Sequence, residues 1–342
     1  MNYRHPGGLR LSCRLRIVNI FNKFLKDLKT DMRKLNESSK ITLTIKQLKR
    51  LVMEAMEPVN EAGIAFGGEA YPKGGNVVIL AGGAGSGKGF ITSNVLLING
   101  KTFDVDSIKP KLIKLGKFKP NSSLPTKFRN KYGYPLMDVD QSDPEQATDL
   151  HNFSQDDEHI YDRALDAFSS NYMLNPKDQL PNLIFDDPLR NVGKLVKFCK
   201  FAESVGYLKE NIHLVWVVNS FEQATLNNVA RGQQPGGRTA PMDTLRKTHE
   251  GAAETMRSIF NKSVDLKGLL DGDIWIVFSK AGVDTEIEGS TLTPHYLTKY
   301  TAYKMKEKKR PIKPFYEIAS WVKDKIHRYI PKRVRRCWGT KV

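Results

Sequence analysis

The sequence predicts an α/β fold in which a doubly wound, five-stranded parallel sheet carries helices on both faces. Three observations predict it: short apolar runs alternate with stretches of helical character, most runs are solidly apolar, and a glycine-rich loop directly follows the first run. Strands buried on both faces of a parallel sheet have this composition, and strands that alternate with helices indicate βαβ units. The predicted strands cover residues 76–80, 102–106, 182–187, 212–219 and 273–280, and helices are expected over 159–173 and 191–206.

Charge divides the 342 residues into three parts. Residues 1–50 hold 13 Lys/Arg against 3 Asp/Glu, residues 304–342 hold 14 against 3, and residues 51–303 hold 27 against 31. We therefore expect a basic helical N-terminal extension and linker over 1–72, the α/β domain over 73–283, and a basic C-terminal appendage over 284–342. The basic termini suit a polyanion such as nucleic acid; solvated, solubilising helices explain them equally well.

Local patterns give the expected elements of these extensions. Amphipathic spacing predicts a helix within 9–36, and a capping-box sequence at Thr44–Gln47 predicts a second helix that runs to about Met56. The Gly/Pro-rich residues 63–75 are typical of a linker, and a helix is expected over 314–329.

Cysteine usage and hydropathy bound the cellular setting. The three cysteines are far apart and form no C-x-x-C pair, which favours a reducing, cytoplasmic location. No apolar run approaches the ~20 residues of a membrane helix. The first 26 residues carry Arg and Lys without an acid, as basic tails and mitochondrial transit peptides both do, and a basic tail is the commoner explanation.

The glycine-rich loop predicts nucleotide binding. Its sequence fits G-x4-G-K between a strand and a helix, the context in which backbone N–H groups converge on phosphate oxygens and the lysine reaches the β- and γ-phosphates. We expect ATP with Mg²⁺ as the cofactors and no dedicated metal ligands. The expected nucleotide-binding residues are Gly82, Gly83, Ala84, Gly85, Ser86, Gly87, Lys88, Gly89 and Phe90.

Gly89 stands where most such loops have a serine or threonine that coordinates Mg²⁺. Adenylate kinases resemble this stretch, because they also carry glycine after the lysine and hold the ion mainly through phosphates and water. GTPases and motor ATPases depend on that hydroxyl. The loop therefore favours a small phosphotransferase.

Two carboxylates, Asp104 and Asp106, follow the second predicted strand. In a doubly wound sheet this edge faces the site, and a kinase needs a carboxylate there to take the proton of the acceptor hydroxyl. Asp106 is the candidate base. The alternative is that Asp106 caps the next helix, with Lys109 in its first turn.

Two further segments lie around the predicted site. Residues 110–157 form a polar, Pro-containing insertion, which we interpret as a cover over the site or as a partly disordered flap. Residues 219–249 place Arg231 and Arg238 on either side of a glycine-rich stretch. Arginines with flexible flanks are what a lid that grips phosphate needs, although a surface loop with incidental arginines has the same composition.

The order of these motifs resembles the zeta-toxin family of P-loop kinases over about residues 74–283. The segment 104–109 matches the family's D-x-D-[ST]-x-[KR] pattern, and residues 182–190 match its third strand with an acid and an arginine. The resemblance implies that Asp106 is the general base, that Asp104, Asp186 and Arg190 bind substrate, and that Arg231 and Arg238 neutralise the transferring phosphate. Gly89, Phe90 and the insertion depart from the family.

We therefore expect a P-loop kinase in which Lys88, Asp106, Arg231 and Arg238 are catalytic. Its acceptor is expected to be a hydroxyl of a small molecule, such as a nucleotide sugar or nucleoside. A 5′-hydroxyl nucleic acid end is the alternative that the basic termini favour, and a nucleotide-binding scaffold without kinase activity is the third. The sequence names no protein partner. His151 and His159 are set aside as surface histidines, and Trp321 and Trp338 are expected to pack against the core.

Overall fold

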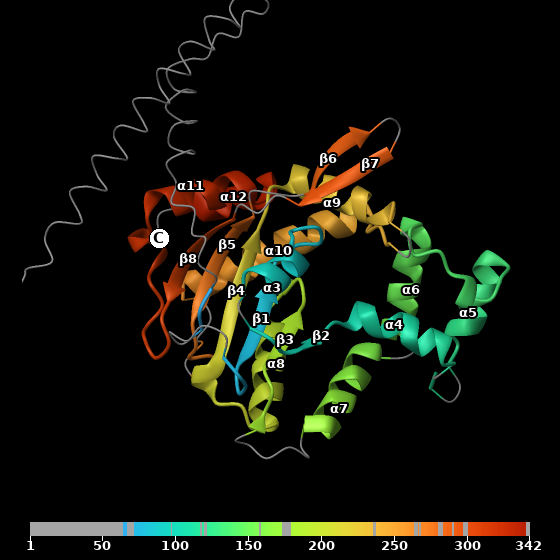
Figure 1. Cartoon of the computed structure of the whole chain (residues 1–342), viewed down its shortest axis with the longest axis horizontal. Coiled ribbons are helices and arrows are strands. Elements are labelled where there is room, and N and C mark those ends of the chain that lie inside the picture. The colour runs from blue at the N-terminus through green and yellow to red at the C-terminus, as the bar shows by residue number, and fades with distance from the viewer. Residues whose placement is uncertain are drawn as a thin grey trace, which may run out of the picture. The chain divides into compact units, whose positions relative to one another are not determined.

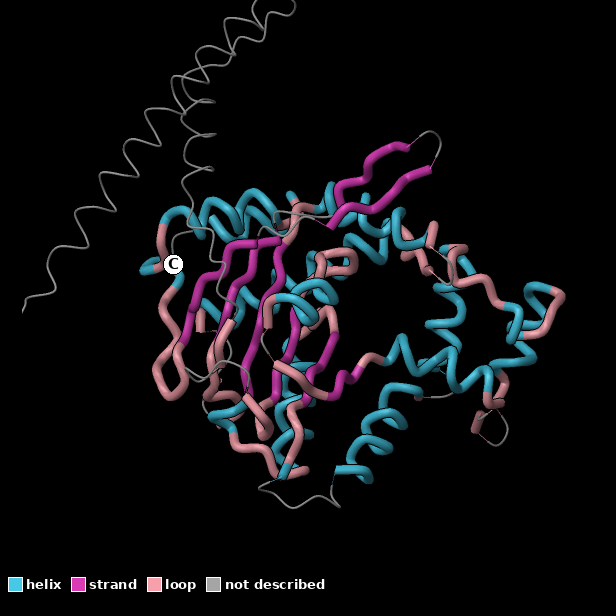
Figure 2. The backbone as a smooth tube through the Cα atoms, in the orientation of Figure 1, coloured by secondary structure: helices cyan, strands magenta, loops and turns pink. Residues whose placement is uncertain are grey.

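A six-stranded sheet forms the centre of the computed structural model, in the order β2-β3-β1-β4-β5-β8 (Figures 1 and 2). Five strands are parallel, and β8 pairs antiparallel with β5 at one edge. A separate hairpin, β6–β7, lies against helix α9 (Figure 1). The strands are β1 (Val77–Ala81), β2 (Lys101–Phe103), β3 (Leu183–Asp186), β4 (Ile212–Val218), β5 (Ile274–Ser279), β6 (Val283–Glu288), β7 (Thr291–Tyr296) and β8 (Tyr300–Lys306).

The structure describes residues 64–66 and 72–339, with short gaps at 97, 117, 120–121, 157–158, 173–178, 235–236, 263–265, 267, 280–282, 289–290 and 297–299. The helices expected over 9–36 and 44–56 lie outside these residues. The helices that are described are α3 (Lys88–Asn94), α4 (Val105–Lys114), α5 (Leu124–Tyr132), α6 (Pro144–Asp156), α7 (Ile160–Tyr172), α8 (Val192–Ser204), α9 (Phe221–Gly232), α10 (Met242–Phe260), α11 (Ser320–Tyr329) and α12 (Lys332–Gly339).

Alternate residues of each strand enter two different cores, because successive side chains point to opposite faces of a sheet. Val77, Ile79 and Ala81 belong to the larger core, which α8, α10, α11 and α12 cover. Val78 and Leu80 belong to the smaller core, which α3 and the segment around Ile64 and Phe66 cover. Both faces of the sheet are therefore buried, which confirms the predicted doubly wound α/β class and explains why the strands are solidly apolar.

The second strand is shorter than predicted. β2 ends at Phe103 and α4 begins at Val105, so Asp104 and Asp106 do not lie on a strand. The Oδ1 atom of Asp104 accepts the backbone N–H of Asp106 at 2.9 Å, a side-chain cap at the start of the helix. This local hydrogen bond favours the helix start over continuation of the strand. Asp104, and not Asp106, therefore makes the cap.

The C-terminal residues are part of the fold and not an appendage. β8 extends the main sheet by one antiparallel strand that the sequence did not predict. The helix expected over 314–329 is α11, which begins only at Ser320. Val322, Ile326 and Trp338 are buried in the larger core, and the Trp338 ring stacks on that of Trp216 at 5.5 Å. Residues 58–342 accordingly belong to one compact unit, and no domain boundary falls at the expected position, residue 283.

The insertion contains ordered helices. α5, the short 3-10 helix Leu136–Asp138 and α6 enclose a small core of Leu124, Phe128, Leu136 and Leu150, and we call this part the helical lobe. It lies beyond the β2 edge of the sheet (Figure 1). The expected linker also contributes to the fold, because Ile64 and Phe66 are almost fully buried. Apolar side chains in a Gly-rich stretch were the signal that this segment is packed.

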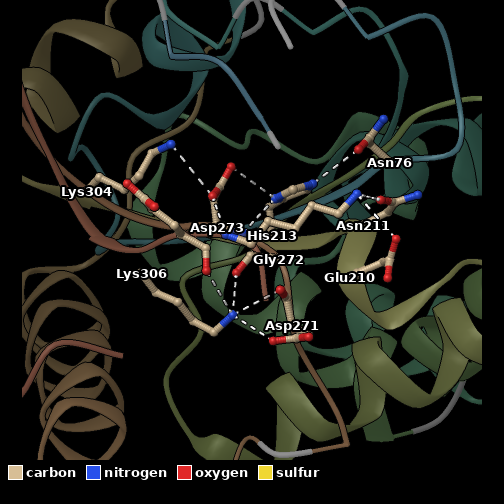
Figure 3. A network of polar contacts seen from close by, with 11 residues as sticks. Asn76, Glu210, Asn211, His213, Asp271, Gly272, Asp273, Lys304 and Lys306 are labelled. Carbon is tan, nitrogen blue, oxygen red and sulfur yellow. Dashed lines mark hydrogen bonds and ion pairs between the residues drawn. The ribbon is translucent and has the colours of Figure 1, made fainter. Parts of the chain in front are cut away.

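A polar network ties β8 to the sheet (Figure 3). It lies at the N-terminal ends of the parallel strands, whereas the glycine-rich loop lies at their C-terminal ends. His213 Nδ1 accepts the backbone N–H of Asp273 at 2.9 Å, and its Nε2 donates to Asn76 Oδ1 at 3.1 Å. Lys306 Nζ donates to the backbone oxygens of Asp271 and Gly272 and to the Asp271 carboxylate. Strands β1, β4, β5 and β8 are thus joined through side chains as well as through the ladder.

This network makes stability depend on pH. His213 is fully buried, and burial lowers its pKa below the ordinary value near 6.5. A depressed histidine pKa contributes stability above pH 6.5 and loses it as the pH falls toward the lowered value, because the unfolded chain binds the proton first. As the pH falls through this range, we expect the free energy of unfolding to decrease by about 1.4 kcal/mol for each pH unit by which the pKa of His213 in the folded protein lies below 6.5. Chemical denaturation between pH 7.5 and 4.5 measures it.

The matched control for this prediction is the exposed His327 on α11. His213→Leu should lower stability at pH 7 and flatten its pH dependence, whereas His327→Leu should leave both unchanged. A His213→Leu protein with the pH slope of the wild type would contradict the assignment.

Candidate functional site

The phosphate loop, residues 82–90, runs from the end of β1 into the first turn of α3, at the C-terminal ends of the parallel strands. Gly85 has a φ of +72°, and a Cβ atom there would stand 2.4 Å from the backbone oxygen of Ala224. Only glycine meets both demands. The loop therefore lies tightly against α9.

Several backbone N–H groups of this loop are available to a ligand. Those of Gly85, Gly87, Lys88 and Gly89 make no hydrogen bond to any residue that the structure describes. Such a set of free N–H groups before a helix is a nest for phosphate oxygens. A Cβ atom at Gly89 would contact nothing within 4 Å, so space does not dictate glycine at the position where a hydroxyl is usual.

Lys88 lies at the mouth of this nest. Its Nζ donates to the backbone oxygen of Gly82 at 3.0 Å and lies 3.7 Å from Asp186 Oδ1, at the end of β3. The ammonium is therefore held between the loop and a carboxylate at the sheet edge, where phosphate oxygens could replace the backbone contact.

Three carboxylates gather beside the loop: Asp104, Asp106 and Asp186. Burial, together with the negative charges of Asp106 and Asp186, raises the pKa of Asp104. Repulsion of this kind favours binding of a cation between the carboxylates. Among the described residues, no group of three or more His, Cys, Asp or Glu side chains is arranged to hold a metal ion by itself.

Asp106 lies at the centre of the site and both of its oxygens are paired. Oδ1 accepts from Lys109 Nζ at 2.7 Å, and Oδ2 accepts from Arg238 at 2.7 Å. Burial raises the pKa of this carboxyl, but the positive charges of Lys109 and Arg238 prevail and hold it well below its usual range. Asp106 is therefore an ionised carboxylate, and its basicity depends on whether Arg238 remains in contact with it.

Lys109 connects Asp106 to the helical lobe. Its side chain is 6% exposed, and its Nζ lies 2.8 Å from His151 Nδ1 on α6. An ammonium can only donate, so His151 accepts through Nδ1. His151 stays a surface residue as the sequence suggested, yet it contacts the site. No sequence pattern predicts this contact, because the partners are 42 positions apart.

Arg231 lies just before the lid, residues 233–241 between α9 and α10, and Arg238 lies within it. Arg231, in the last turn of α9, donates from Nε to the backbone oxygen of Arg238 at 3.0 Å. Arg238 reaches Asp106, as described above. The backbone N–H of Thr239 also donates to the Gln141 oxygen of the helical lobe at 3.2 Å. Lid and helical lobe thus meet around Asp106.

Arg190 is less closely joined to the other expected residues. It precedes α8 and is exposed, and its backbone packs so closely on Gly251 of α10 that a Cβ atom there would lie 2.7 Å from the Arg190 oxygen. No described contact joins its guanidinium to Asp106 or to the phosphate loop. Its role in substrate binding stays a prediction.

Comparison with known proteins adds little to this geometry. No protein-family model and no curated protein matches the chain. Solved structures match weakly. A chain from the PezAT chromosomal toxin-antitoxin system of Streptococcus pneumoniae is 13% identical with a TM-score of 0.35, over 69% of this chain and 77% of that one.

The AvrRxo1-ORF1:AvrRxo1-ORF2 complex matches in its native form at 11% identity and a TM-score of 0.37, and with ATP at 10% and 0.38, in both cases over 77% of this chain and 74% of that one. All these TM-scores lie below 0.5. The assignment to the P-loop α/β class, which the sequence predicted, rests instead on the chain's own sheet topology and on its phosphate loop at the end of β1.

Proposed function

We propose that the chain is an ATP-dependent phosphotransferase that moves the γ-phosphate of ATP to a hydroxyl of a small molecule, such as a nucleotide sugar or nucleoside. The observation that carries this proposal is the contact between Arg238 and Asp106, because it brings the lid and the candidate base together in the cluster of carboxylates that includes Asp186, the partner of Lys88. A phosphate-binding nest, a carboxylate and arginines in one place are the parts that phosphoryl transfer needs.

The proposed step assigns a role to each of these residues. The N–H groups of the loop and Lys88 hold the phosphates of ATP. The acceptor oxygen forms a bond to the γ-phosphorus as the bond to the β,γ-bridging oxygen breaks and ADP leaves. Asp106 takes the hydroxyl proton, and Arg231 and Arg238 neutralise charge on the transferring group.

The carboxylates of Asp104 and Asp186 fit Mg²⁺ bound together with the nucleotide. Magnesium is commonly held by one or two carboxylates, waters and substrate phosphates, which matches a loop without a hydroxyl at position 89. When bound, the ion neutralises charge that develops between the β- and γ-phosphates.

The proposal is tested by transfer of labelled γ-phosphate from ATP to a panel of acceptors. The panel contains nucleotide sugars, nucleosides, nucleoside monophosphates and 5′-hydroxyl oligonucleotides. Lys88→Ala should bind ATP at least tenfold more weakly, because it loses a charge-assisted contact to phosphate. Lys200→Ala, on the exposed side of α8, is the matched control.

The outcomes separate three candidate activities. A labelled small molecule supports the proposal, and label on oligonucleotide ends would replace it with a nucleic acid kinase. ATP binding without any labelled acceptor would leave a nucleotide-binding scaffold. Normal ATP binding and transfer by Lys88→Ala would contradict the role of the loop.

A further inference from the structure

Side chains of α9 and α10 hold two consecutive residues of the phosphate loop. Thr248 Oγ1 accepts the backbone N–H of Ala84 at 3.0 Å. His249 Nε2 lies 2.8 Å from the backbone oxygen of Ala84, and Asn227 Nδ2 donates to the backbone oxygen of Gly85 at 2.7 Å. Both polar groups of Ala84 are therefore bound by neighbouring residues of one helix, 164 and 165 positions away.

The direction of each hydrogen bond is fixed by its surroundings. The Thr248 hydroxyl gives its proton to the Leu245 oxygen at 2.7 Å, which leaves a lone pair to accept from Ala84. The carbonyl of Ala84 can only accept, so His249 donates from Nε2. Burial lowers the pKa of His249 to about 4, and the ring is neutral at pH 7 in this single tautomer.

The His249 ring also takes the place of a side chain at Gly83. A Cβ atom there would stand 2.0 Å from Cδ2 of the ring, so any larger residue would displace the histidine. The Phe221 ring of α9 packs edge-on against the His249 ring, with centroids 5.8 Å apart. His249 thus contacts both α9 and the loop that it holds.

This arrangement orients a free N–H group toward the nest. In a trans peptide the C=O of one residue and the N–H of the next point in opposite directions. The carbonyl of Ala84 points to α10, so the N–H of Gly85 points away from it, and this N–H is one of those without a partner among the described residues. The hydrogen bonds from α10 to Ala84 thus leave the N–H of Gly85 free to bind a ligand.

The same helices carry the lid. Asn227 and Arg231 lie four positions apart on one face of α9. Asn228 Oδ1 accepts the backbone N–H of Ala240, just before α10 begins, and Asn228 Nδ2 donates to the Ala240 oxygen. The loop and the lid are thus held by neighbouring residues of α9, the loop by Asn227 and the lid by Asn228.

We propose that Asn227, Thr248 and His249 are positioning residues that hold the phosphate loop in its ATP-binding conformation and join it to the lid. The inference rests on the proposed function, since it presumes that the loop receives ATP. It predicts that loss of the hydrogen bonds from these three side chains to Ala84 and Gly85 weakens ATP binding and makes the loop more mobile, with little change in turnover once ATP is saturating.

The experiment compares Thr248→Val with Thr248→Ser in the full-length protein. Valine keeps the shape of threonine and removes the hydroxyl, whereas serine keeps the hydroxyl. In the protein without nucleotide, hydrogen exchange of the peptide that covers residues 80–90 should be about tenfold faster in Thr248→Val than in the wild type, as expected for loss of one buried hydrogen bond. The Kd and KM for ATP should rise about tenfold while kcat changes less than twofold, and Thr248→Ser should match the wild type.

A second pair guards against a variant that fails to fold. Asn227→Ala removes a half-buried side chain from α9 and should weaken ATP binding several-fold, whereas Leu226→Ala, on the exposed side of the same helix, should not. Thr248→Val and Asn227→Ala proteins with the exchange and ATP affinity of their controls would overturn the proposal. If the wild type binds no ATP, the proposed function fails, and the exchange rates still decide whether Thr248 and Asn227 hold the loop in place.

Discussion

The Asp106→Asn protein is expected to transfer phosphate about 10²–10⁴ times more slowly than the wild type, the range that loss of a general base covers. Asparagine has nearly the same shape and keeps one acceptor oxygen for Lys109 or Arg238, but its amide nitrogen only donates, and the amide cannot take the acceptor's proton. ATP affinity should change little, because Asp106 does not contact the phosphate loop. Single-turnover transfer of labelled phosphate, with ATP affinity measured separately, checks both.

The control is Asp138→Asn, which removes an exposed carboxylate from the helical lobe and should leave transfer unchanged. The pH dependence gives a second check. Because Lys109 and Arg238 hold the pKa of Asp106 below its usual range, the carboxylate stays ionised, and kcat/KM should show no loss from this group between pH 7 and 5. Full activity of Asp106→Asn on the natural acceptor would remove Asp106 from the mechanism.

The parallel core was predictable from the sequence because its signals are local. β1, β3, β4 and β5 are runs of Val, Ile and Phe, and the phosphate loop follows the first of them directly. β8 was not predictable in the same way. Only the second half of its sequence, Tyr303–Lys306, alternates between apolar and basic residues, and its place in the sheet depends on pairing with β5 and on ion pairs such as Lys306 with Asp271.

The candidate site divides along the same line. The loop, Asp106 and the arginines follow strands or glycines in a pattern that predicts their proximity. Thr248 and His249 sit within a regular helix and have no motif of their own, and only the folded chain shows that they contact Ala84. Lys109 and His151 meet for the same reason, across a lobe whose packing no short pattern specifies.

The Arg238→Ala protein is expected to lose about 10³-fold or more in kcat, the effect of an arginine that stabilises charge on a transferring phosphoryl group. Arg238 is bound to Asp106, so the residue that must reach the phosphate also contacts the base. Its transfer from one to the other would raise the basicity of Asp106 at the moment when the proton has to leave the acceptor.

Two measurements separate these contributions. Removing the guanidinium should raise the pKa of Asp106 toward the ordinary aspartate value near 4, so an acid limb should appear at higher pH in Arg238→Ala than in the wild type. The double variant Asp106→Asn/Arg238→Ala should be less impaired than the product of the single effects, because the two groups are in contact. Arg246→Ala, an exposed arginine on α10, is the matched control and should be neutral. An Arg238→Ala protein with unchanged kcat but a shifted acid limb would make Arg238 a partner of the base alone and leave Arg231 as the lid residue.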